Sequence, residues 1–373
     1  MKSTKQSVDK PLYGFIIALA AGGIVILASA SMALGEQDFG HAGYYVLRQI
    51  VFGGLLGLIG FFAAQYIPYR WWRRAALPLL VATFILMALV FIPEFGFSSG
   101  GATRWLRFGF FSFQPAEVMK LVFVMYLASW LDARRKEVSS VAYGTLPFVI
   151  MLGVLSIFLI MQPDIGTLGI IVVSSGLLYY LGGGRISQMA TLSALGVALL
   201  FLLIQLAPYR SHRLQVFLNP GLDPQGIGYQ INQAFIAIGS GGITGRGFGL
   251  GVQKYNYLPE PMGDSIFAIF AEETGFIGAC ILMFLFLAFI WRGFIIAKRA
   301  PDVFGKLLAA GIVVSIATQA YINMAAISGL LPLTGVPLPL VSYGSTSLAI
   351  TLVSTGILLN ISKYGSIPAR SSY

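Results

Sequence analysis

Charged residues are scarce in this chain of 373 residues, in which aspartate, glutamate, lysine and arginine together make up 10%; a soluble protein averages about a quarter. Cysteine occurs once, as Cys280, which excludes a disulfide framework and a cysteine-rich metal site. The two histidines, His41 and His212, leave little material for a histidine-based site. The sequence has no Walker A motif. These shortages exclude disulfide-stabilised proteins, proteins with a cysteine-rich metal site and P-loop proteins.

Apolar residues are correspondingly abundant, at 57% of the chain, and the mean hydropathy is +0.81. A soluble fold would leave much of this apolar surface in water, so the composition predicts one all-α, polytopic membrane domain. The net charge of +10 lies mostly in short basic clusters between apolar runs. This pattern is typical of membrane orientation, and we expect no nucleic-acid partner.

Ten apolar runs predict ten transmembrane helices. They cover residues 12–34, 44–66, 76–92, 115–131, 144–161, 167–181, 187–206, 265–291, 307–330 and 343–362. The pair at 144–181 is interrupted by Gln162-Pro163-Asp164, so one broken element is the alternative there. The first run is too long for a typical signal-peptide core and lacks a convincing cleavage site, which predicts that it is retained.

Lysine and arginine predict the orientation of these helices. With the N-terminus in the cytoplasm, the inside segments hold most basic residues, including Lys2, Lys5, Lys10, Arg70, Arg73, Arg74, Arg134, Arg135, Lys136, Arg292, Lys298, Arg299 and Arg370. We therefore expect a single transmembrane domain, 1–373, with spans between about 12 and 362 and both termini cytoplasmic. The two longer outer loops are 93–114 and 207–264, and the second is the larger.

Charged residues within spans are costly and therefore draw attention to function. Glu117 and Lys120 are three residues apart and share a helix face. They form either a structural ion pair or the charged lining of a cavity for a polar headgroup. Glu272 and Glu273 follow in a later span, where an ion-pair network is favoured over a cation pathway.

The loop 207–264 contains two further candidates. The glycine-rich stretch 239–249 could bring backbone N–H groups to an anion, with Arg246 and Lys254 adding positive charge; a flexible hinge is the alternative. Asp264 directly precedes an apolar helix, where it is either an N-cap or a carboxylate whose pKa is raised by partial desolvation. The proline-rich stretch 329–344, which includes Ser342, cannot form a continuous helix.

Several of these segments, in this order, resemble the SEDS family (shape, elongation, division and sporulation proteins) over nearly the whole chain. The matching motifs are Arg104-Trp105-Leu106, Phe113-Gln114-Pro115-Ala116-Glu117, Gln162-Pro163-Asp164-Ile165-Gly166-Thr167, Ala237-Ile238-Gly239-Ser240-Gly241-Gly242, Tyr257-Leu258-Pro259-Glu260, Asp264 with Glu272-Glu273, and Ser342-Tyr343-Gly344. Gln253-Lys254 before Tyr257 is more similar to division members than to elongation members. Met262-Gly263 stands where the family often has His-Thr, and Ser345-Thr346 departs from its Tyr-Gly-Gly-Ser turn.

The resemblance implies a ten-helix SEDS fold and a peptidoglycan glycosyltransferase that polymerises lipid II, with Asp264 matching the family's essential aspartate. It also implies a multi-pass protein of the bacterial inner membrane at the division septum. The expected partners are lipid II, undecaprenyl-linked glycan, a class B penicillin-binding protein that acts as transpeptidase, other divisome membrane proteins and membrane lipids. A lipid II flippase and a non-catalytic divisome scaffold are the alternatives.

A mechanism follows from this expectation. Asp264 is the candidate general base for an inverting displacement that releases undecaprenyl pyrophosphate. The growing negative charge would be stabilised by Arg246 and Lys254, or else by Arg48 near an outer helix end or by a divalent cation. Glu117, Lys120 and Ser342 complete the predicted substrate-binding residues. No cofactor is required by this scheme.

Overall fold

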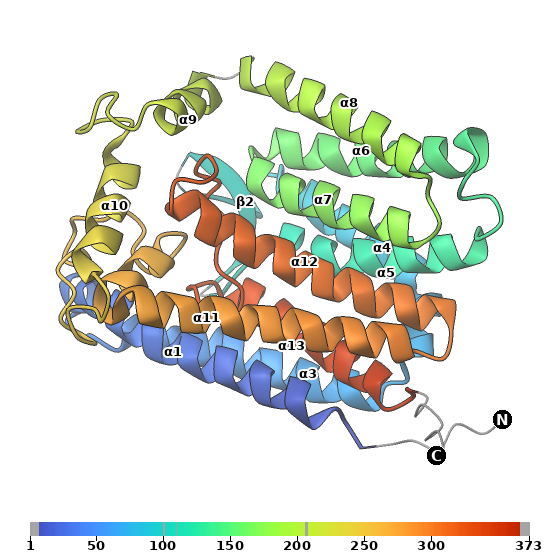
Figure 1. Cartoon of the computed structure of the whole chain (residues 1–373), viewed down its shortest axis with the longest axis horizontal. Coiled ribbons are helices and arrows are strands. Elements are labelled where there is room, and N and C mark those ends of the chain that lie inside the picture. The colour runs from blue at the N-terminus through green and yellow to red at the C-terminus, as the bar shows by residue number, and fades with distance from the viewer. Residues whose placement is uncertain (1–6, 100, 110, 206–207, 366–373) are drawn as a thin grey trace.

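The computed structural model describes residues 7–99, 101–109, 111–205 and 208–365, which form one helical body (Figure 1). Its first half contains α1 (Lys10–Phe39), α2 (Tyr44–Arg48), the π-helix η1 (Gln49–Leu55), α3 (Leu56–Tyr66), α4 (Tyr69–Leu89), β1 (Gly96–Ser99), β2 (Ala102–Phe108), β3 (Phe111–Phe113), α5 (Pro115–Ala133), the π-helix η2 (Val141–Thr145) and α6 (Leu146–Met161). Its second half contains α7 (Ile165–Leu181), α8 (Ile186–Gln205), α9 (Pro208–Leu218), α10 (Tyr229–Gly241), α11 (Ile266–Arg299), α12 (Val303–Ile327) and α13 (Ser345–Ser362).

Ordinary capping residues begin several of the long helices. The carboxylates of Asp9, Asp164 and Asp302 accept hydrogen bonds from the backbone N–H groups three residues later, at the starts of α1, α7 and α12. Pro115 begins α5, where the missing N–H of proline costs nothing. Asp164 therefore starts a new helix, so the interruption at 162–164 separates α6 from α7.

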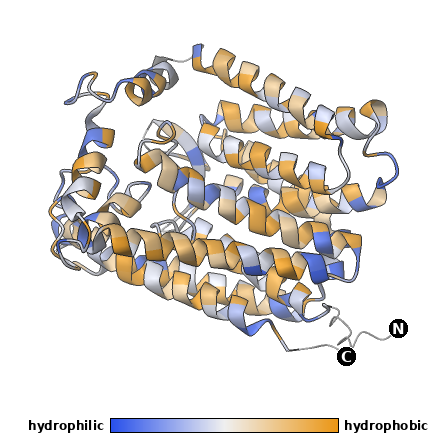
Figure 2. Cartoon of the chain, in the orientation of Figure 1, coloured by the Kyte–Doolittle hydropathy of each residue, from blue (hydrophilic) through white to orange (hydrophobic). Residues whose placement is uncertain are grey.

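Eight helical segments of the described chain are long and apolar enough to cross a membrane, and Figure 2 shows the predominance of hydrophobic residues along the helices. They are Lys10–Phe39, Tyr44–Tyr66, Tyr69–Leu89, Val141–Met161, Ile186–Gln205, Ile266–Arg299, Val303–Ile327 and Ser345–Ser362. Two other predicted spans are also helices: α7 is 17 residues long, and α5 carries Glu117, Lys120 and Asp132. The protein is a multi-pass membrane protein.

Burial divides the helices into inner and outer ones. Most residues of α12 and α13 are buried, and α5 packs against α4, α7 and α12. By contrast, α8 is exposed along nearly all its length. The charged and amide side chains of α5 and α12 therefore lie inside the bundle, where they require partners.

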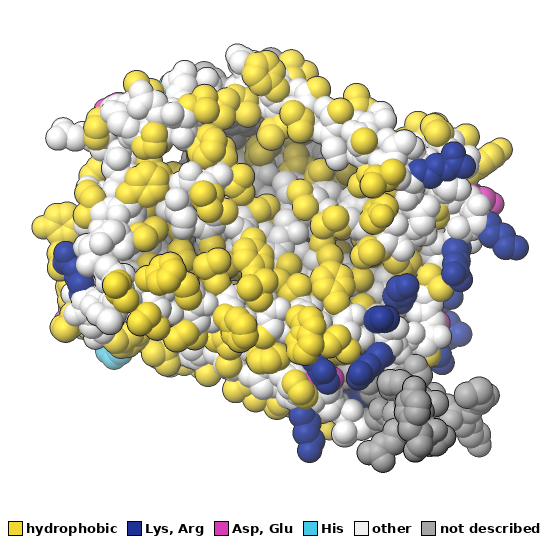
Figure 3. Space-filling view, in the orientation of Figure 1, with side chains coloured by type: hydrophobic (Ala, Val, Ile, Leu, Met, Phe, Trp, Pro, Cys, Tyr) yellow, Lys and Arg dark blue, Asp and Glu magenta, His cyan; other side chains and the backbone are white. Residues whose placement is uncertain are grey.

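Lysine and arginine side chains gather at one end of the face shown in Figure 3, near the chain ends, and the broad middle of this face is hydrophobic. The opposite end carries few cations in this view. Lys2, Lys5 and Arg370 lie outside the described residues. This distribution agrees with the basic clusters seen in the sequence.

The two longer loops between spans contain regular structure. The loop 93–114 forms an antiparallel sheet in the order β1-β2-β3, which departs from the expected all-α fold. The stretch 207–264 contains α9, α10 and an irregular segment that leads into α11. Its hydrogen bonds to α11 and α12 position the candidate site.

Candidate active site

Asp264 lies in an irregular turn immediately before α11. The N-cap residue of α11 is Ser265, and no side chain caps this end of the helix. The interpretation of Asp264 as a helix N-cap is therefore wrong. Its half-buried carboxylate is not used to start the helix and is left for other contacts.

Two helices, α10 and α12, and the neighbouring Ser265 hold Asp264. The amide nitrogen of Gln230, on α10, donates to both carboxylate oxygens at 3.3 and 3.4 Å. The same nitrogen donates to Ser265 Oγ at 3.1 Å, and this hydroxyl lies 3.5 Å from Asp264 Oδ1. Asn323, on α12, donates to the backbone carbonyl of Asp264 at 2.8 Å. The carboxylate is thus oriented by α10 and its backbone by α12.

The surroundings of Asp264 raise its pKa from 3.8 to about 6. Burial is the main cause, because it penalises the charged form, and the negative charge of Glu260 adds to it. Arg213 and the hydrogen bond from Gln230 lower the pKa and offset part of this effect. A carboxylate with a pKa near 6 is mostly ionised at neutral pH and is a stronger base than an ordinary aspartate.

Lys254 does not face this site. Its side chain is fully buried, and Nζ lies 2.7 Å from Glu273 Oε1, 2.7 Å from the carbonyl of Gly249 and 2.9 Å from Ser29 Oγ. The hydroxyl of Ser29, on α1, donates in turn to Glu273. The expected role of Lys254 as an anion ligand does not fit this geometry, because its ammonium group binds Gly249 in the same segment and joins that segment to α1 and α11.

Arg246 is also engaged by α11. Its Nη1 lies 3.6 Å from Glu272 Oε1, and the Glu272 carboxylate accepts hydrogen bonds from the backbone N–H groups of Val252 and Gln253. The predicted ion-pair network of Glu272 and Glu273 is confirmed by these contacts. A pyrophosphate at Arg246 would have to compete with Glu272, so the expected anion role of Arg246 is not favoured.

The glycine-rich stretch packs against a break in α11. Gly275 has φ +68° inside this helix, and a Cβ there would lie 2.3 Å from the nitrogen of Gly245. The N–H groups of Arg246 and Gly247 donate to the carbonyls of Glu272 and Glu273 at 3.0 Å. These two N–H groups therefore complete the helix break and are not available to the anion that the sequence predicted for this stretch.

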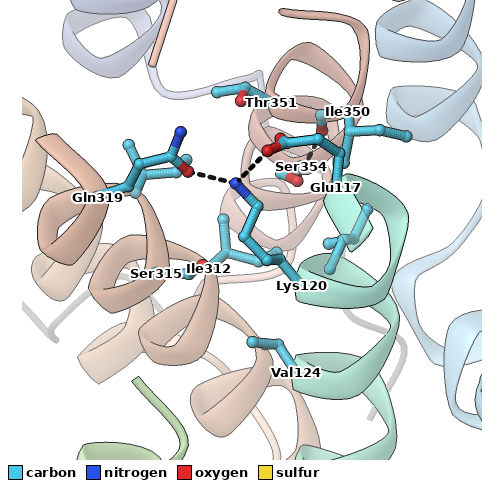
Figure 4. Close-up of a pocket in the computed structure, with 11 residues that line it drawn as sticks. Glu117, Lys120, Val124, Ile312, Ser315, Gln319, Ile350, Thr351 and Ser354 are labelled. Atoms are coloured by element: carbon cyan, nitrogen blue, oxygen red, sulfur yellow. Dashed lines mark hydrogen bonds and ion pairs between the residues drawn. The ribbon is translucent and has the colours of Figure 1, made fainter. Parts of the chain in front are cut away.

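Glu117 and Lys120 line a buried pocket between α5, α12 and α13 (Figure 4). Their ion pair measures 2.9 Å, and both side chains are buried. Lys120 also donates to Gln319, and Ser315, Thr351 and Ser354 add hydroxyl groups to the lining. The ion pair expected from the sequence is present, and its two side chains also line this pocket; binding of a polar headgroup there stays a prediction.

One face of α12 connects this pocket to Asp264. Gln319 accepts from Lys120 and donates to the carbonyl of Pro337 at 2.9 Å. Asn323, one turn further along α12, donates to the carbonyls of Val336 at 2.7 Å and of Asp264. The proline-rich segment is thereby fastened to α12. Gln230 and Asn323 carried no signal in the sequence.

Ser342 and Arg48 lie at a second turn. Ser342 is buried, and its Oγ accepts from the backbone N–H of Leu338 at 2.8 Å, so it stabilises its own turn. Arg48 is near enough to Tyr343 to act on it electrostatically, and the Tyr343 N–H donates to the carbonyl of Met262. Ser342 therefore does not present its hydroxyl to a ligand, whereas Arg48 borders the turn that contacts the Asp264 segment.

No cluster of three or more histidine, cysteine, aspartate or glutamate side chains in the described residues could hold a metal ion. Asp264 and its neighbours offer a carboxylate base, the amide groups of Gln230 and Asn323, and the guanidinium of Arg213. This set suits proton removal from a hydroxyl group beside an anionic ligand.

Known proteins provide an independent comparison. Residues 11–367 match the family model FtsW/RodA/SpoVE, described as cell cycle protein. Stage V sporulation protein E of Bacillus subtilis is 40% identical over 367 residues, covering 98% of this chain and 99% of that protein. The probable peptidoglycan glycosyltransferase FtsW of Geobacter metallireducens is 38% identical, covering 93% and 92%.

Solved structures are similar over the same length. A chain from a peptidoglycan synthase complex, described as coordinating polymerization and crosslinking, has a TM-score of 0.75 and 27% identity, covering 95% of this chain and 97% of that one. The rod shape determining protein RodA of Thermus thermophilus has a TM-score of 0.68 and 26% identity, covering 95% and 96%. The chain therefore belongs to the FtsW/RodA/SpoVE family of cell cycle proteins, the family that its motifs indicated.

Proposed function

We propose that this protein is a peptidoglycan glycosyltransferase that polymerises lipid II into β-1,4-linked glycan strands. The observation that carries the proposal is Asp264, a half-buried carboxylate with a raised pKa, oriented by Gln230 and held at the start of α11. Relatives named as probable peptidoglycan glycosyltransferases support the same activity.

In the proposed reaction, Asp264 removes the proton from the 4-hydroxyl group of the acceptor sugar. The oxygen attacks C1 of the lipid-linked donor, the bond between C1 and the phosphate oxygen breaks, and its electron pair leaves with undecaprenyl pyrophosphate. The configuration at C1 inverts from α to β. Since pyrophosphate is a good leaving group, no second carboxylic acid is needed to protonate it, in contrast to ordinary glycoside hydrolysis.

We propose that the chain crosses the membrane ten times, with α5 and α7 completing the set, and that both termini are cytoplasmic. The segment 207–264 then lies outside, together with Asp264. The cations at the end of the molecule near the chain ends support this orientation, because basic residues favour the cytoplasmic side. Lipid tails would hold both sugars at one depth beside the outer ends of the helices, which limits their orientations.

The test is polymerisation of labelled lipid II by the purified protein. Asp264→Asn should keep the fold and lower the rate by about 10²–10⁴, the usual contribution of a general base. Asp223→Asn is the matched control, since Asp223 is an exposed aspartate of the same outer stretch. Glycan strands made by Asp264→Asn at nearly the parent rate would refute the assignment.

A lipid II transporter is the second candidate, because the pocket of Glu117 and Lys120 places charge and hydroxyl groups deep in the bundle. Movement of lipid II across a vesicle membrane without polymer would select this function. A non-catalytic scaffold instead predicts that Asp264→Asn supports normal cell growth.

We also propose that the protein acts with a class B penicillin-binding protein, among other divisome membrane proteins, at the division septum. The similarity to a chain of a peptidoglycan synthase complex supports a transpeptidase partner. Similarity to several FtsW proteins supports division, and the sporulation relative makes spore formation the competing process. A fluorescent fusion that marks the septum of growing cells would support division, whereas a signal confined to sporulating cells would contradict it.

A further inference from the structure

An apolar pocket lies between α9, α10 and the segment that follows α12. Its walls include Val216 and Phe217 from α9, Ile231 and Phe235 from α10, and Leu331 and Leu333. Arg213, also on α9, contributes the positive charge of this lining. The pocket therefore combines one cation with a wall of aliphatic and aromatic side chains.

The guanidinium of Arg213 is available to a ligand. It is exposed, and its Nη1 donates to the carbonyl of Leu333 at 2.9 Å. Arg213 takes part in none of the ion pairs formed within the part of the chain that the structure describes, whereas Arg246 and Lys254 of the same outer stretch are both paired. A guanidinium with a single carbonyl partner retains N–H groups for a phosphate.

Arg213 and Asp264 both lie next to Gly335. A Cβ on Gly335 would lie 3.9 Å from Asp264 Oδ2 and 4.0 Å from Arg213 Nη1, so these two atoms are at most about 8 Å apart. Gly335 has φ +70°, a conformation that favours glycine, and any side chain on it would begin beside both groups.

The upper bound of about 8 Å places both groups within reach of the same pair of reacting sugars. In an inverting displacement the attacking oxygen and the leaving group lie on opposite sides of the anomeric carbon, so the base and the group that receives the leaving phosphate are different residues. An arginine at the far position would stabilise the charge that develops on a departing phosphate. The apolar wall beside it would suit the hydrocarbon attached to that phosphate.

We propose that Arg213 and this pocket bind the pyrophosphate and the first isoprene units of the lipid-linked donor, a proposal that rests on the glycosyltransferase function above. The pyrophosphate contacts Arg213, and the chain runs between α9 and α10 along Phe217 and Phe235. Acceptor and donor are then distinguished by position, with the acceptor hydroxyl group at Asp264 and the donor phosphates at Arg213.

Binding can be tested without relying on activity. The purified full-length protein would be titrated with farnesyl pyrophosphate, inorganic pyrophosphate and farnesol, and the thermal shift recorded. We expect farnesyl pyrophosphate to stabilise the protein most, and Arg213→Ala to require at least about tenfold more of it, as for a lost charged hydrogen bond. Arg213→Lys should recover part of the affinity. Arg135→Ala should have no effect, because Arg135 is an exposed arginine that follows the C-terminal end of α5.

The apolar wall of the pocket can be tested separately with a matched pair of variants. Leu331 lines the pocket and is 40% exposed, whereas its neighbour Leu330 is outside the lining and is 74% exposed. Leu331→Trp should weaken farnesyl pyrophosphate but not inorganic pyrophosphate, and Leu330→Trp should change neither.

The two proposals fail separately. Equal affinity of the parent and Arg213→Ala for farnesyl pyrophosphate would overturn the binding site, even if Asp264→Asn abolished polymerisation. Equal affinity of the parent for farnesyl and inorganic pyrophosphate would overturn the isoprene part. Arg213-dependent binding in a protein that makes no polymer would support the site while refuting the glycosyltransferase.

Discussion

The raised pKa of Asp264 predicts a steep acid dependence of polymerisation. With a pKa of about 6, the carboxylate is about nine-tenths ionised at pH 7 and about one-tenth ionised at pH 5. We expect the rate to fall about tenfold between these values, because only the ionised form accepts the proton. An aspartate with the ordinary pKa of 3.8 would change the rate by less than about a tenth over the same interval.

The neighbours of Asp264 provide the sharper version of this test. Glu260→Gln removes a negative charge that raises the pKa, so the acid limb should move to lower pH. Arg213→Ala removes a positive charge that lowers it, so the limb should move to higher pH. Asp223→Asn should leave the limb in place. The measurement is the initial rate of glycan formation by purified protein between pH 4.5 and pH 8, with folding checked at each pH.

The raised pKa of Asp264 also predicts how Asp264→Asn changes the stability of the folded protein. Because the pKa of Asp264 is higher in the folded state, the folded protein binds a proton more tightly, and its stability falls as the pH rises from 3.8 to about 6. At pH 7 this cost is at most about 3 kcal/mol, less after allowance for partial exposure. Asp264→Asn should therefore raise the free energy of unfolding at pH 7 while lowering activity. A flat rate between pH 5 and pH 7, or an unchanged limb in Glu260→Gln, would refute the reasoning.

Three further variants test the surrounding contacts. Glu117→Ala leaves Lys120 buried without its carboxylate, so we expect a loss of about 3–5 kcal/mol and a lower folded yield; normal yield with lost activity would instead indicate a role of the pocket in function. Lys254→Met leaves Glu273 buried and unpaired and should lower the unfolding temperature similarly, whereas an unchanged temperature with a raised KM for lipid II would restore its anion role. Asn323→Leu removes the donor to the Asp264 carbonyl and should lower kcat more than it raises KM, and equal effects on both would contradict a positioning role.

The helices could be predicted because each requires only a sufficiently long apolar run. The antiparallel sheet was missed, although Gly100-Gly101 between Phe97 and Thr103 is a hairpin signal, because the short strands lie in a loop between stronger membrane signals. The break in α11 at Gly275 could not be predicted from the sequence. A glycine within an apolar run indicates nothing about its dihedral angles until the packing against Gly245 is known.

The residues of the candidate site also differ in how far the sequence could predict them. Asp264 could be found from its motif and its place before a helix. Lys254 was assigned to anions because a sequence displays a charge but not its partner, and Glu273, with which it pairs, lies on another element. Arg213 could not be singled out, since nothing in the sequence brings α9 next to Gly335. Lys254 and Arg213 are both basic residues, and they differ in their tertiary contacts, which the sequence does not display.

The break at Gly275 gives α11 two mechanically distinct parts. The short part from Ile266 to Thr274 follows Asp264 and is tied through Glu273 to α1, whereas the long part from Phe276 to Arg299 spans the bundle. The glycine-rich stretch holds both parts, because the N–H groups of Phe276 and Ile277 donate to the carbonyls of Gly242 and Ile243. A transmembrane segment of another protein that tilted the long part would therefore displace this stretch as well, and a movement at the lipid-facing helix would be passed to the segment that precedes Asp264.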